Sequence, residues 1–332
     1  MKILLTLDYE LFLGEKTGSV QKCLIEPMEL LQTNTNPWNV KFTLFVDAVY
    51  LYRLKTYTTT YPELREDFAA IAEHLKTLQT QGHDIQLHIH PHWWFSHYNG
   101  KRWMLDNEHY KLSDLTEKEA QDIFTTSKEC LEKIVGKKVI AFRAGGFSAQ
   151  PTERLTKLLK TNGMIIDSSV YPGNFYKSSH QEYDYRNCPD KAWWRFEKDI
   201  CKEEREGELM EMPLTVYRLH PLFYWKLTAT KLLKQSQHRL LGDGISVKTA
   251  SDSIWQRLTQ RTCGFATIDG YKASYLYKAY RKALGEDKEI FNVIGHPKLT
   301  TPYSVKQLNK FCAQIDTNAE YVTISQCYEE MY

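Results

Sequence analysis

Short apolar runs alternate with amphipathic segments over most of the chain. The apolar runs predict strands at Ile3–Leu7, Lys41–Val46, Asp84–His88, Val139–Phe142, Met164–Asp167, Leu209–Pro213, Phe291–Ile294 and Tyr321–Ile324. Apolar residues at helical spacing predict helices at Pro62–Thr80, Leu115–Val135, Thr152–Thr161, Ala273–Leu284 and Val305–Ile315. Because strands that alternate with helices favour a parallel sheet with crossover helices, we expect an α/β fold.

Two stretches depart from this alternation. Asn174–Glu208 is polar and charged, and we expect it to form a long excursion. His220–Gly264 predicts two helices, Leu222–Leu241 and Val247–Thr262, separated by the loop Gly242-Asp243-Gly244. No internal repeat, heptad pattern or linker rich in Gly and Ser divides the chain, so we expect one domain over residues 1–332.

The composition excludes some classes of protein. The 332 residues are 42% hydrophobic and 25% charged, which is typical of a globular protein and excludes disorder as the main state. The 43 Lys and Arg against 41 Asp and Glu leave a net charge of +2, so no nucleic-acid partner is expected. The 13% aromatic residues can fill a core or line a groove of sugar size.

The cysteines and the first residues bear on the compartment. Seven Cys with no CxxC pair are typical of free thiols in a reducing compartment. The apolar run before Asp8 is too short for a signal peptide or a membrane span. We therefore expect a cytoplasmic protein with no leader, no preceding domain and no membrane span. The oligomeric state is not indicated.

Histidines are concentrated in one segment. Four of the eleven lie within ten residues, in Gly82–Trp94. Neutral imidazole is the commonest metal ligand, and Pro91 predicts that the strand ends near His88. His88 and His92 could then converge on one metal ion from the strand end and the loop. The alternative is that these are loop histidines satisfied by hydrogen bonds.

Other polar residues follow predicted strands. Asp8 and Glu10 come after the first strand and, two residues apart, project to the same side. Arg143, Asp167 and His296 each follow a later strand. Alone, each could serve as an ordinary turn or cap residue. Because the carboxyl ends of parallel strands carry active sites, their common position favours one shared site.

In this order the motifs resemble the polysaccharide deacetylase family, the hydrolases related to chitooligosaccharide deacetylases. The resemblance extends from Met1 to about Pro297 and implies a distorted (β/α) barrel of seven to eight strands. It rests on Leu5-Thr6-Leu7-Asp8, Gly82-His83-Asp84-Ile85-Gln86-Leu87-His88-Ile89-His90-Pro91-His92, Ala141-Phe142-Arg143-Ala144-Gly145-Gly146-Phe147, Ile166-Asp167-Ser168-Ser169 and Ile294-Gly295-His296.

The resemblance implies removal of an acetyl group from an N-acetylated sugar with a divalent metal, usually zinc. Three protein ligands would leave one metal position open for water. The implied metal ligands are His88 and His92, with Glu10 as the third. The implied catalytic residues are Asp8 as general base, His296 as general acid, Asp167 tuning His296, and Arg143 holding Asp8. The implied substrate contacts are the backbone at Gly146 and Phe147; Trp93, with Trp94 and Trp103, could stack on the sugar.

The chain departs from the family pattern at several positions. Tyr9 stands where the family has a second Asp, and Glu10 is the nearest substitute. Gly145 replaces the usual Pro, and His90 is an additional imidazole. The long interval between Asp167 and His296 predicts an insertion within residues 174–288.

Three functions are consistent with these motifs. The leading hypothesis is a deacetylase acting on a surface polysaccharide or its biosynthetic precursor. A second is a hydrolase of ring amides in small nitrogenous compounds, on the same fold. A third is a carbohydrate-binding protein that no longer binds the metal, because its first motif has Tyr9 in place of a second Asp.

Overall fold

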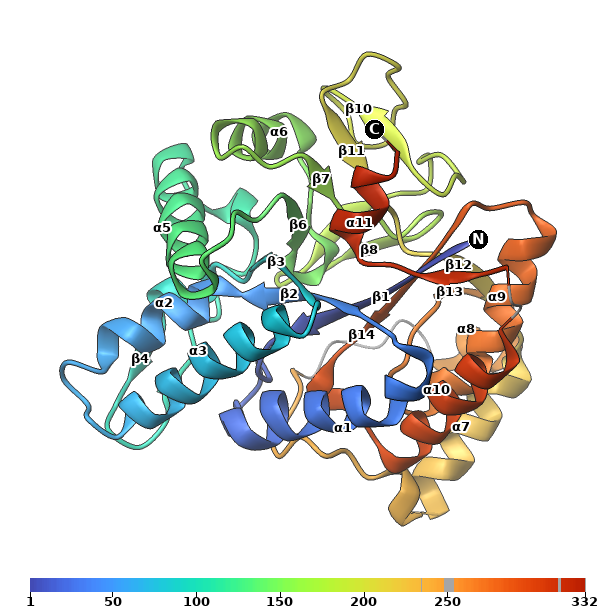
Figure 1. The fold of residues 1–332 in the computed structure, drawn as a ribbon, viewed down its shortest axis with the longest axis horizontal. Coiled ribbons are helices and arrows are strands. Elements are labelled where there is room, and N and C mark those ends of the chain that lie inside the picture. Colours follow the sequence, from blue (N-terminus) through green and yellow to red (C-terminus); the bar gives the residue numbers. More distant parts are fainter. Residues whose placement is uncertain (234, 248–253, 316–317, 332) are drawn as a thin grey trace. The chain divides into compact units, whose positions relative to one another are not determined.

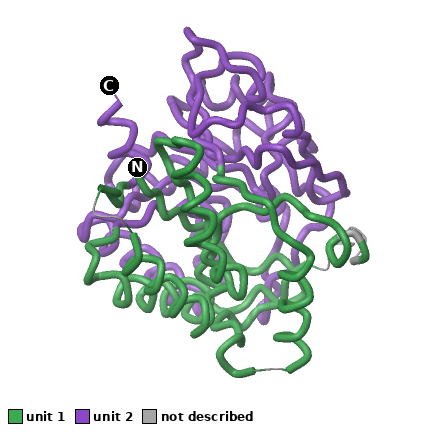
Figure 2. Tube along the Cα trace, turned by 90° about the vertical axis from the view of Figure 1, so that its right-hand side faces the viewer, with its two compact units in different colours: residues 1–40, 214–322 green, residues 41–213, 323–332 purple. Residues whose placement is uncertain are grey.

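The computed structural model describes residues 1–233, 235–247, 254–315 and 318–331. By its contacts the chain divides into two compact units, each formed from two separate stretches of sequence (Figure 2). Unit 1 comprises Met1–Val40 and Leu214–Val322, and unit 2 comprises Lys41–Pro213 and Thr323–Tyr332. The single domain over residues 1–332 remains a prediction.

Unit 2 contains a mainly parallel sheet with the strand order β10-β11-β7-β6-β3-β2, in which only β10 is antiparallel to its neighbour (Figure 1). Its strands are β2 (Phe42–Asp47), β3 (Asp84–Ile89), β6 (Ala141–Ala144), β7 (Ile166–Asp167), β10 (Trp194–Phe196) and β11 (Leu209–Glu211). Two short hairpins are separate from this sheet: β4 (His97–Tyr98) pairs with β5 (Trp103–Met104), and β8 (Phe175–Lys177) pairs with β9 (Glu182–Asp184). Its helices are α2 (Ala48–Tyr57), α3 (Leu64–Thr80), α4 (His92–Phe95), α5 (Glu117–Val135), α6 (Thr152–Thr161) and α11 (Ile324–Glu329).

Local sequence accounts for these elements. Every residue of β2 and β3 is buried, as expected for parallel strands covered on both faces. The helix α5 begins at a capping box, in which the Glu119 N–H donates to Thr116 Oγ1 and the Thr116 N–H donates to Glu119 Oε2. It ends at Gly136, whose φ of 70° suits glycine. No helix in the described ranges is long and apolar enough to cross a membrane.

Unit 1 places β1 between two parallel neighbours, β14 and β15. Its strands are β1 (Lys2–Tyr9), β12 (Val216–Leu219), β13 (Thr262–Phe265), β14 (Ile290–Gly295) and β15 (Glu320–Tyr321). Its helices are α1 (Glu26–Thr35), α7 (Pro221–Leu233), α8 (Ile254–Thr259), α9 (Leu276–Gly285) and α10 (Pro302–Gln314). The strands β12 and β13 form a separate antiparallel pair.

Several predicted elements differ from the structure. The strand predicted at Tyr321–Ile324 stops at Tyr321, because Thr323 caps the helix α11 that begins at Ile324. The helix predicted at Leu222–Leu241 ends at Leu233.

Close packing requires glycine at two positions of the loop Gly242-Asp243-Gly244. A Cβ atom at Gly242 would lie 2.4 Å from the Lys298 carbonyl oxygen, and one at Gly244 would lie 2.3 Å from the Phe12 ring. Of the helix predicted at Val247–Thr262, residues 248–253 lie outside the described residues, Ile254–Thr259 is helical, and Thr262 begins β13.

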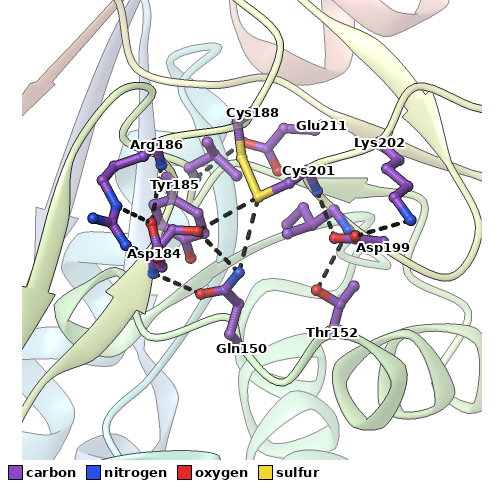
Figure 3. The surroundings of a disulfide bond; sticks show 12 residues. Gln150, Thr152, Asp184, Tyr185, Arg186, Cys188, Asp199, Cys201, Lys202 and Glu211 are labelled. Atoms are coloured by element: carbon purple, nitrogen blue, oxygen red, sulfur yellow. Dashed lines mark hydrogen bonds and ion pairs between the residues drawn. A yellow bond between two sulfur atoms is a disulfide. The ribbon is translucent and has the colours of Figure 1, made fainter.

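The excursion predicted at Asn174–Glu208 lies between β7 and β11 and contains a disulfide between Cys188 and Cys201 (Figure 3). The prediction that all seven cysteines are free thiols is therefore wrong for these two, and the other five form no disulfide in the described residues. Gln150 makes two hydrogen bonds to the backbone of this region. Its Oε1 accepts from the Asp184 N–H at 2.7 Å, and its Nε2 donates to the Asp184 carbonyl at 3.2 Å.

Removing the disulfide should destabilise the protein. The two cysteines are 13 residues apart, and releasing a loop of that size from the unfolded chain costs about 3 kcal/mol of unfolding free energy. We expect the Cys188→Ser/Cys201→Ser variant to show this loss in guanidinium denaturation. A reductant should lower the midpoint of the wild type and leave that of the variant unchanged. Equal midpoints for oxidised wild type and variant would contradict this.

Candidate functional site

The residues of unit 1 that the sequence singled out come together at one end of β1 and β14. These strands are parallel with Leu7 opposite Gly295, so Asp8 and His296 follow at the same edge. His296 Nε2 lies 3.7 Å from Asp8 Oδ2 and 3.7 Å from Glu10 Oε1. Both carboxylates are buried. An imidazole beside two buried acids can exchange protons with a bound substrate.

A residue that the sequence analysis did not single out, Asp269, orients His296. Its Oδ2 lies 2.8 Å from His296 Nδ1, and its Oδ1 accepts from the His296 N–H, also at 2.8 Å. The segment before it runs beside β14, because Thr267 bridges to Ile294 and the Ile268 N–H donates to the Ile294 carbonyl. Asp269 thus makes the contact with His296 that the resemblance assigned to Asp167.

The charges around His296 favour its protonated form. Burial alone would lower the pKa of His296, but the carboxylate of Asp269, helped by those of Asp8 and Glu10, outweighs burial and raises this pKa above its ordinary value. The bond from Nδ1 to Asp269 leaves Nε2 directed at the two acids. The ring is therefore held as a proton donor whose Nε2–H faces the buried carboxylates.

Lys298 is a second residue missed by the sequence analysis. Its buried ammonium donates to Glu10 Oε1 at 2.8 Å and to the Leu11 carbonyl at 2.7 Å. The sequence offered a weak signal, since Lys298 stands two residues after His296. Because Oε1 accepts from this cation, a metal bound by Glu10 would use the other oxygen.

In unit 2, the predicted histidines lie at the carboxyl end of β3. The pairing of β3 with β6 sets His88 opposite Arg143, and His88 Nδ1 donates to the Arg143 carbonyl at 2.8 Å. This bond leaves the lone pair of the ring on Nε2, the arrangement that a metal-binding histidine needs. The ring centroid of His90 lies 4.7 Å from that of His88 and 5.5 Å from that of His92.

Two departures from the family pattern, Gly145 and His90, depend on each other. A Cβ atom at Gly145 would lie 2.6 Å from His90 Nδ1, so only glycine at position 145 leaves room for the additional imidazole. The ring nitrogens nearest each other in His88 and His90 lie within 4.8 Å. The ring of His92 instead stacks on Tyr110 at 4.7 Å. The structure thus brings His90 toward His88, whereas the predicted pair was His88 and His92.

Arg143 and Asp167 belong to a buried polar network in unit 2. Arg143 donates from Nε to the Ser168 carbonyl at 2.9 Å and from Nη2 to Ser168 Oγ at 3.1 Å. Asp167 accepts from the Ser169 N–H and from Ser169 Oγ, both at 2.9 Å. These bonds fix both side chains at the ends of their strands.

Glu211, which the sequence analysis did not single out, pairs with Asp167. The parallel strands β7 and β11 set the two residues side by side, so that two buried carboxyl groups lie next to each other. Burial, and next the charge of Asp167, raises the pKa of Glu211 well above its ordinary value. Glu211 therefore keeps its proton beside the Asp167 carboxylate, while its Oε1 accepts from the Val170 N–H at 3.0 Å.

The predicted substrate contacts have mixed outcomes. Trp93 is 0% exposed, with its ring 4.7 Å from that of Tyr50 and 5.5 Å from that of Trp103, so the prediction that it stacks on a sugar is wrong. Gly146 and Phe147 both have positive φ, of 58° and 59°. Their carbonyls accept from Gln181 Nε2 and from the Tyr185 hydroxyl, which fixes this strained turn. Contact of the Gly146 and Phe147 backbone with the substrate remains a prediction.

Comparison with known proteins places the fold. No family model and no curated protein matches the sequence. A structure from Mycobacterium smegmatis, provisionally named a polysaccharide deacetylase, matches with a TM-score of 0.54 and 17% identity, covering 99% of this chain and 89% of its own. PuuE allantoinase matches with a TM-score of 0.50 and 12% identity over the same shares. The chain therefore has the fold of the polysaccharide deacetylases, and the predicted α/β class with a distorted barrel is confirmed.

The raised pKa of Glu211 predicts a pH dependence of stability. The stability that its protonation contributes is fully present below the ordinary Glu pKa of about 4.3 and is lost as pH rises toward the raised pKa of the folded state. Glu211→Gln keeps an oxygen that can accept from the Val170 N–H but removes the titrating group. At about pH 8 we expect it to raise the unfolding free energy by about 1–3 kcal/mol.

Denaturation of both proteins across the acid-to-alkaline range measures this difference. Glu208→Gln, at an exposed carboxylate beside the same strand, serves as the matched control and should follow the wild type. A Glu211→Gln variant whose stability runs parallel to that of the wild type would refute the assignment.

The contact between Asp269 and His296 predicts a change that NMR can detect. In metal-free protein, Asp269→Asn removes the charge that stabilises the imidazolium, so the pKa of His296 should fall. Titration of its ring proton signals measures this. Asp243→Asn, at a unit 1 carboxylate bonded to Ser19, is the control and should leave the His296 titration unchanged. The same pKa in wild type and Asp269→Asn would show that Asp269 does not act on the ring.

Proposed function

We propose that this protein is a metal-dependent hydrolase that removes an N-acetyl group from a sugar of a polysaccharide or its biosynthetic precursor. The observation that carries the proposal is the buried pair of His296 and Asp269 beside Asp8 and Glu10. Hydrolysis of an amide needs one group that takes a proton from water and another that gives a proton to the leaving nitrogen. The order of the motifs and the shared fold support the deacetylase reading.

The residues present fit a divalent metal. His88, with Nδ1 held by a carbonyl, has the tautomer of a ligand, and His90 and His92 are buried beside it. Glu10 offers a buried carboxylate. We propose that His88 and one further imidazole of this group hold the ion, with Glu10 as the third ligand that the resemblance implies. Zinc is the simplest choice of ion because of the imidazole donors. When bound, such an ion polarises the acetyl carbonyl and lowers the pKa of water.

The chain's own residues then divide the proton transfers. Asp8 takes a proton from the attacking water, and Arg143 holds Asp8 in the role that the resemblance gives it. His296 gives the Nε2 proton to the departing amine nitrogen, while Asp269 keeps the ring oriented and stabilises its charge. Asp167, fixed by Ser169, supports Arg143 electrostatically. The Gly146 and Phe147 backbone contacts the acetyl oxygen.

Two other functions have support of their own. The full-length similarity to PuuE allantoinase favours hydrolysis of a ring amide in a small nitrogenous compound. The ion pair of Lys298 with Glu10 favours a carbohydrate-binding protein without metal, since a cation already occupies one oxygen of that carboxylate.

The disulfide bears on the predicted cytoplasmic location. Because disulfides are typical of oxidising compartments, it weakens the inference of a reducing compartment that was drawn from the cysteines.

Metal analysis combined with acetate release tests the proposal. Chelated protein reloaded with zinc or cobalt should hold one ion and release acetate from N-acetylhexosamine oligosaccharides. His88→Ala should lose the ion, whereas His97→Ala, at an exposed histidine of the same segment, should keep it. His296→Gln should keep the ion and lower kcat by about 10²–10⁴-fold, the usual share of a general acid.

Each contrary outcome identifies another function. A bound ion with hydrolysis of cyclic ureides but not of acetylated sugars would identify the ring-amide hydrolase. No ion in the wild type, together with saccharide binding, would identify the binding protein. Acetate release that is unchanged in His88→Ala would refute the metal assignment.

A further inference from the structure

Positive charge is concentrated in one part of unit 1. Residues 212–268 contain eight Lys or Arg and two Asp or Glu, although the whole chain carries a net charge of only +2. The rest of the molecule is therefore slightly acidic. Such an asymmetry points to an anionic partner for this segment.

Three of these cations, together with Lys278 from farther along the chain, line a pocket of about 390 Å³. Arg218 comes from β12, Lys226 from α7 and Lys278 from α9, while Arg261 directly precedes β13. All four side chains are exposed, and none forms an ion pair with a carboxylate in the part of the chain that the structure describes. His220 adds an imidazole to the same wall. Four cations without acidic partners make a site for a group of high negative charge, such as a phosphate.

Large apolar side chains surround this pocket. Leu222 lines it, and Trp225, one turn along α7, is 56% exposed. Farther along the same helix Leu232 is 77% exposed, and on α8 Trp255 is 74% exposed. The two helices pack together, with Trp225 Nε1 donating to the Leu258 carbonyl at 3.1 Å (Figure 1). The opposite side of α7 buries Phe223, so the helix has one apolar face in the core and another in solvent.

We propose that this surface, called here the α7–α8 surface, binds an anionic phospholipid membrane, with the pocket holding a headgroup phosphate. Trp and Leu side chains interleaved with Lys and Arg are the composition of helices that lie in a membrane interface. The rings and aliphatic chains enter the boundary between headgroups and acyl chains, and the cations contact the phosphates.

Other occupants fit these observations less well. A soluble phosphorylated compound would use the cations but would leave Trp225, Leu232 and Trp255 in water. A second copy in a twofold interface would bring the same uncompensated positive charges face to face. Of these three occupants, the lipid surface is the one that satisfies both the phosphate-binding cations and the exposed apolar side chains. The inference does not depend on the proposed deacetylase activity.

Sedimentation with vesicles tests this proposal on the full chain. We expect binding to phosphatidylcholine vesicles that contain phosphatidylglycerol, weak binding to phosphatidylcholine alone, and release at high salt. Arg218→Gln/Lys278→Gln should weaken binding by about 30-fold, since each cation near an anionic surface contributes about 1 kcal/mol. Leu232→Ser/Trp255→Ser should weaken it without changing its salt dependence. Lys118→Gln/Lys133→Gln, which removes equal charge from α5, should bind as the wild type does.

Thermal unfolding at the same temperature as the wild type shows that each variant is folded. With this control, each of the following outcomes would contradict the proposal. Equal binding by the wild type and the Arg218→Gln/Lys278→Gln variant would overturn it. Binding of pyrophosphate, measured calorimetrically, without binding to vesicles would identify a soluble phosphorylated ligand instead. A stable dimer that the Leu232→Ser/Trp255→Ser variant loses, with no vesicle binding, would identify a second copy as the occupant.

Discussion

The parallel pairing of β1 with β14 is the constraint on which the candidate site in unit 1 depends. It joins the start of the sequence to its last third, so that Lys298 can bond to Glu10 across 288 residues of chain. The register of this pairing determines which side chains meet, because a shift of one residue would turn Asp8 or His296 to the other face. A local sequence change in either strand would therefore disturb the acid–base arrangement as well as the core.

Buried charge is the second recurring feature, and each unit compensates for it differently. In unit 1 carboxylates are paired with cations, as in Glu10 with Lys298 and Asp269 with the imidazolium of His296. In unit 2 Asp167 is stabilised by hydroxyl and amide donors and by a neutral Glu211. Removing one partner from such a network leaves a buried charge uncompensated, which costs several kcal/mol. These networks hold functional side chains in one orientation at the expense of stability.

The sequence predicts most of the framework, because the strands are short apolar runs and the helices are amphipathic. It predicts Thr152–Thr161 with the observed bounds. It misses α2, where consecutive apolar residues are buried and no helical period is visible. It extends the helix predicted at Leu222–Leu241 past the end of α7 at Leu233. It also cannot show the close contacts that require Gly242 and Gly244, because their partners are distant in sequence.

The candidate site is predicted in its residue types and less well in its partners. Asp8 and His296 could be found because each comes just after an apolar run that predicts a strand. Asp269 and Glu211 could not, since their roles arise from pairing between strands remote in sequence. For the same reason the sequence could not show that Gly145 makes room for His90, or that Trp93 is covered by other rings.

The central claim is that the buried histidines of unit 2 bind a metal used in hydrolysis. Anomalous X-ray diffraction from crystals grown with zinc tests it most directly, because it locates the ion without an assay or a chosen substrate. The account predicts a peak at ligand distance, about 2.0–2.1 Å, from Nε2 of His88 and from a second imidazole of this group. Fully formed density for these side chains with no anomalous peak beside them would contradict it.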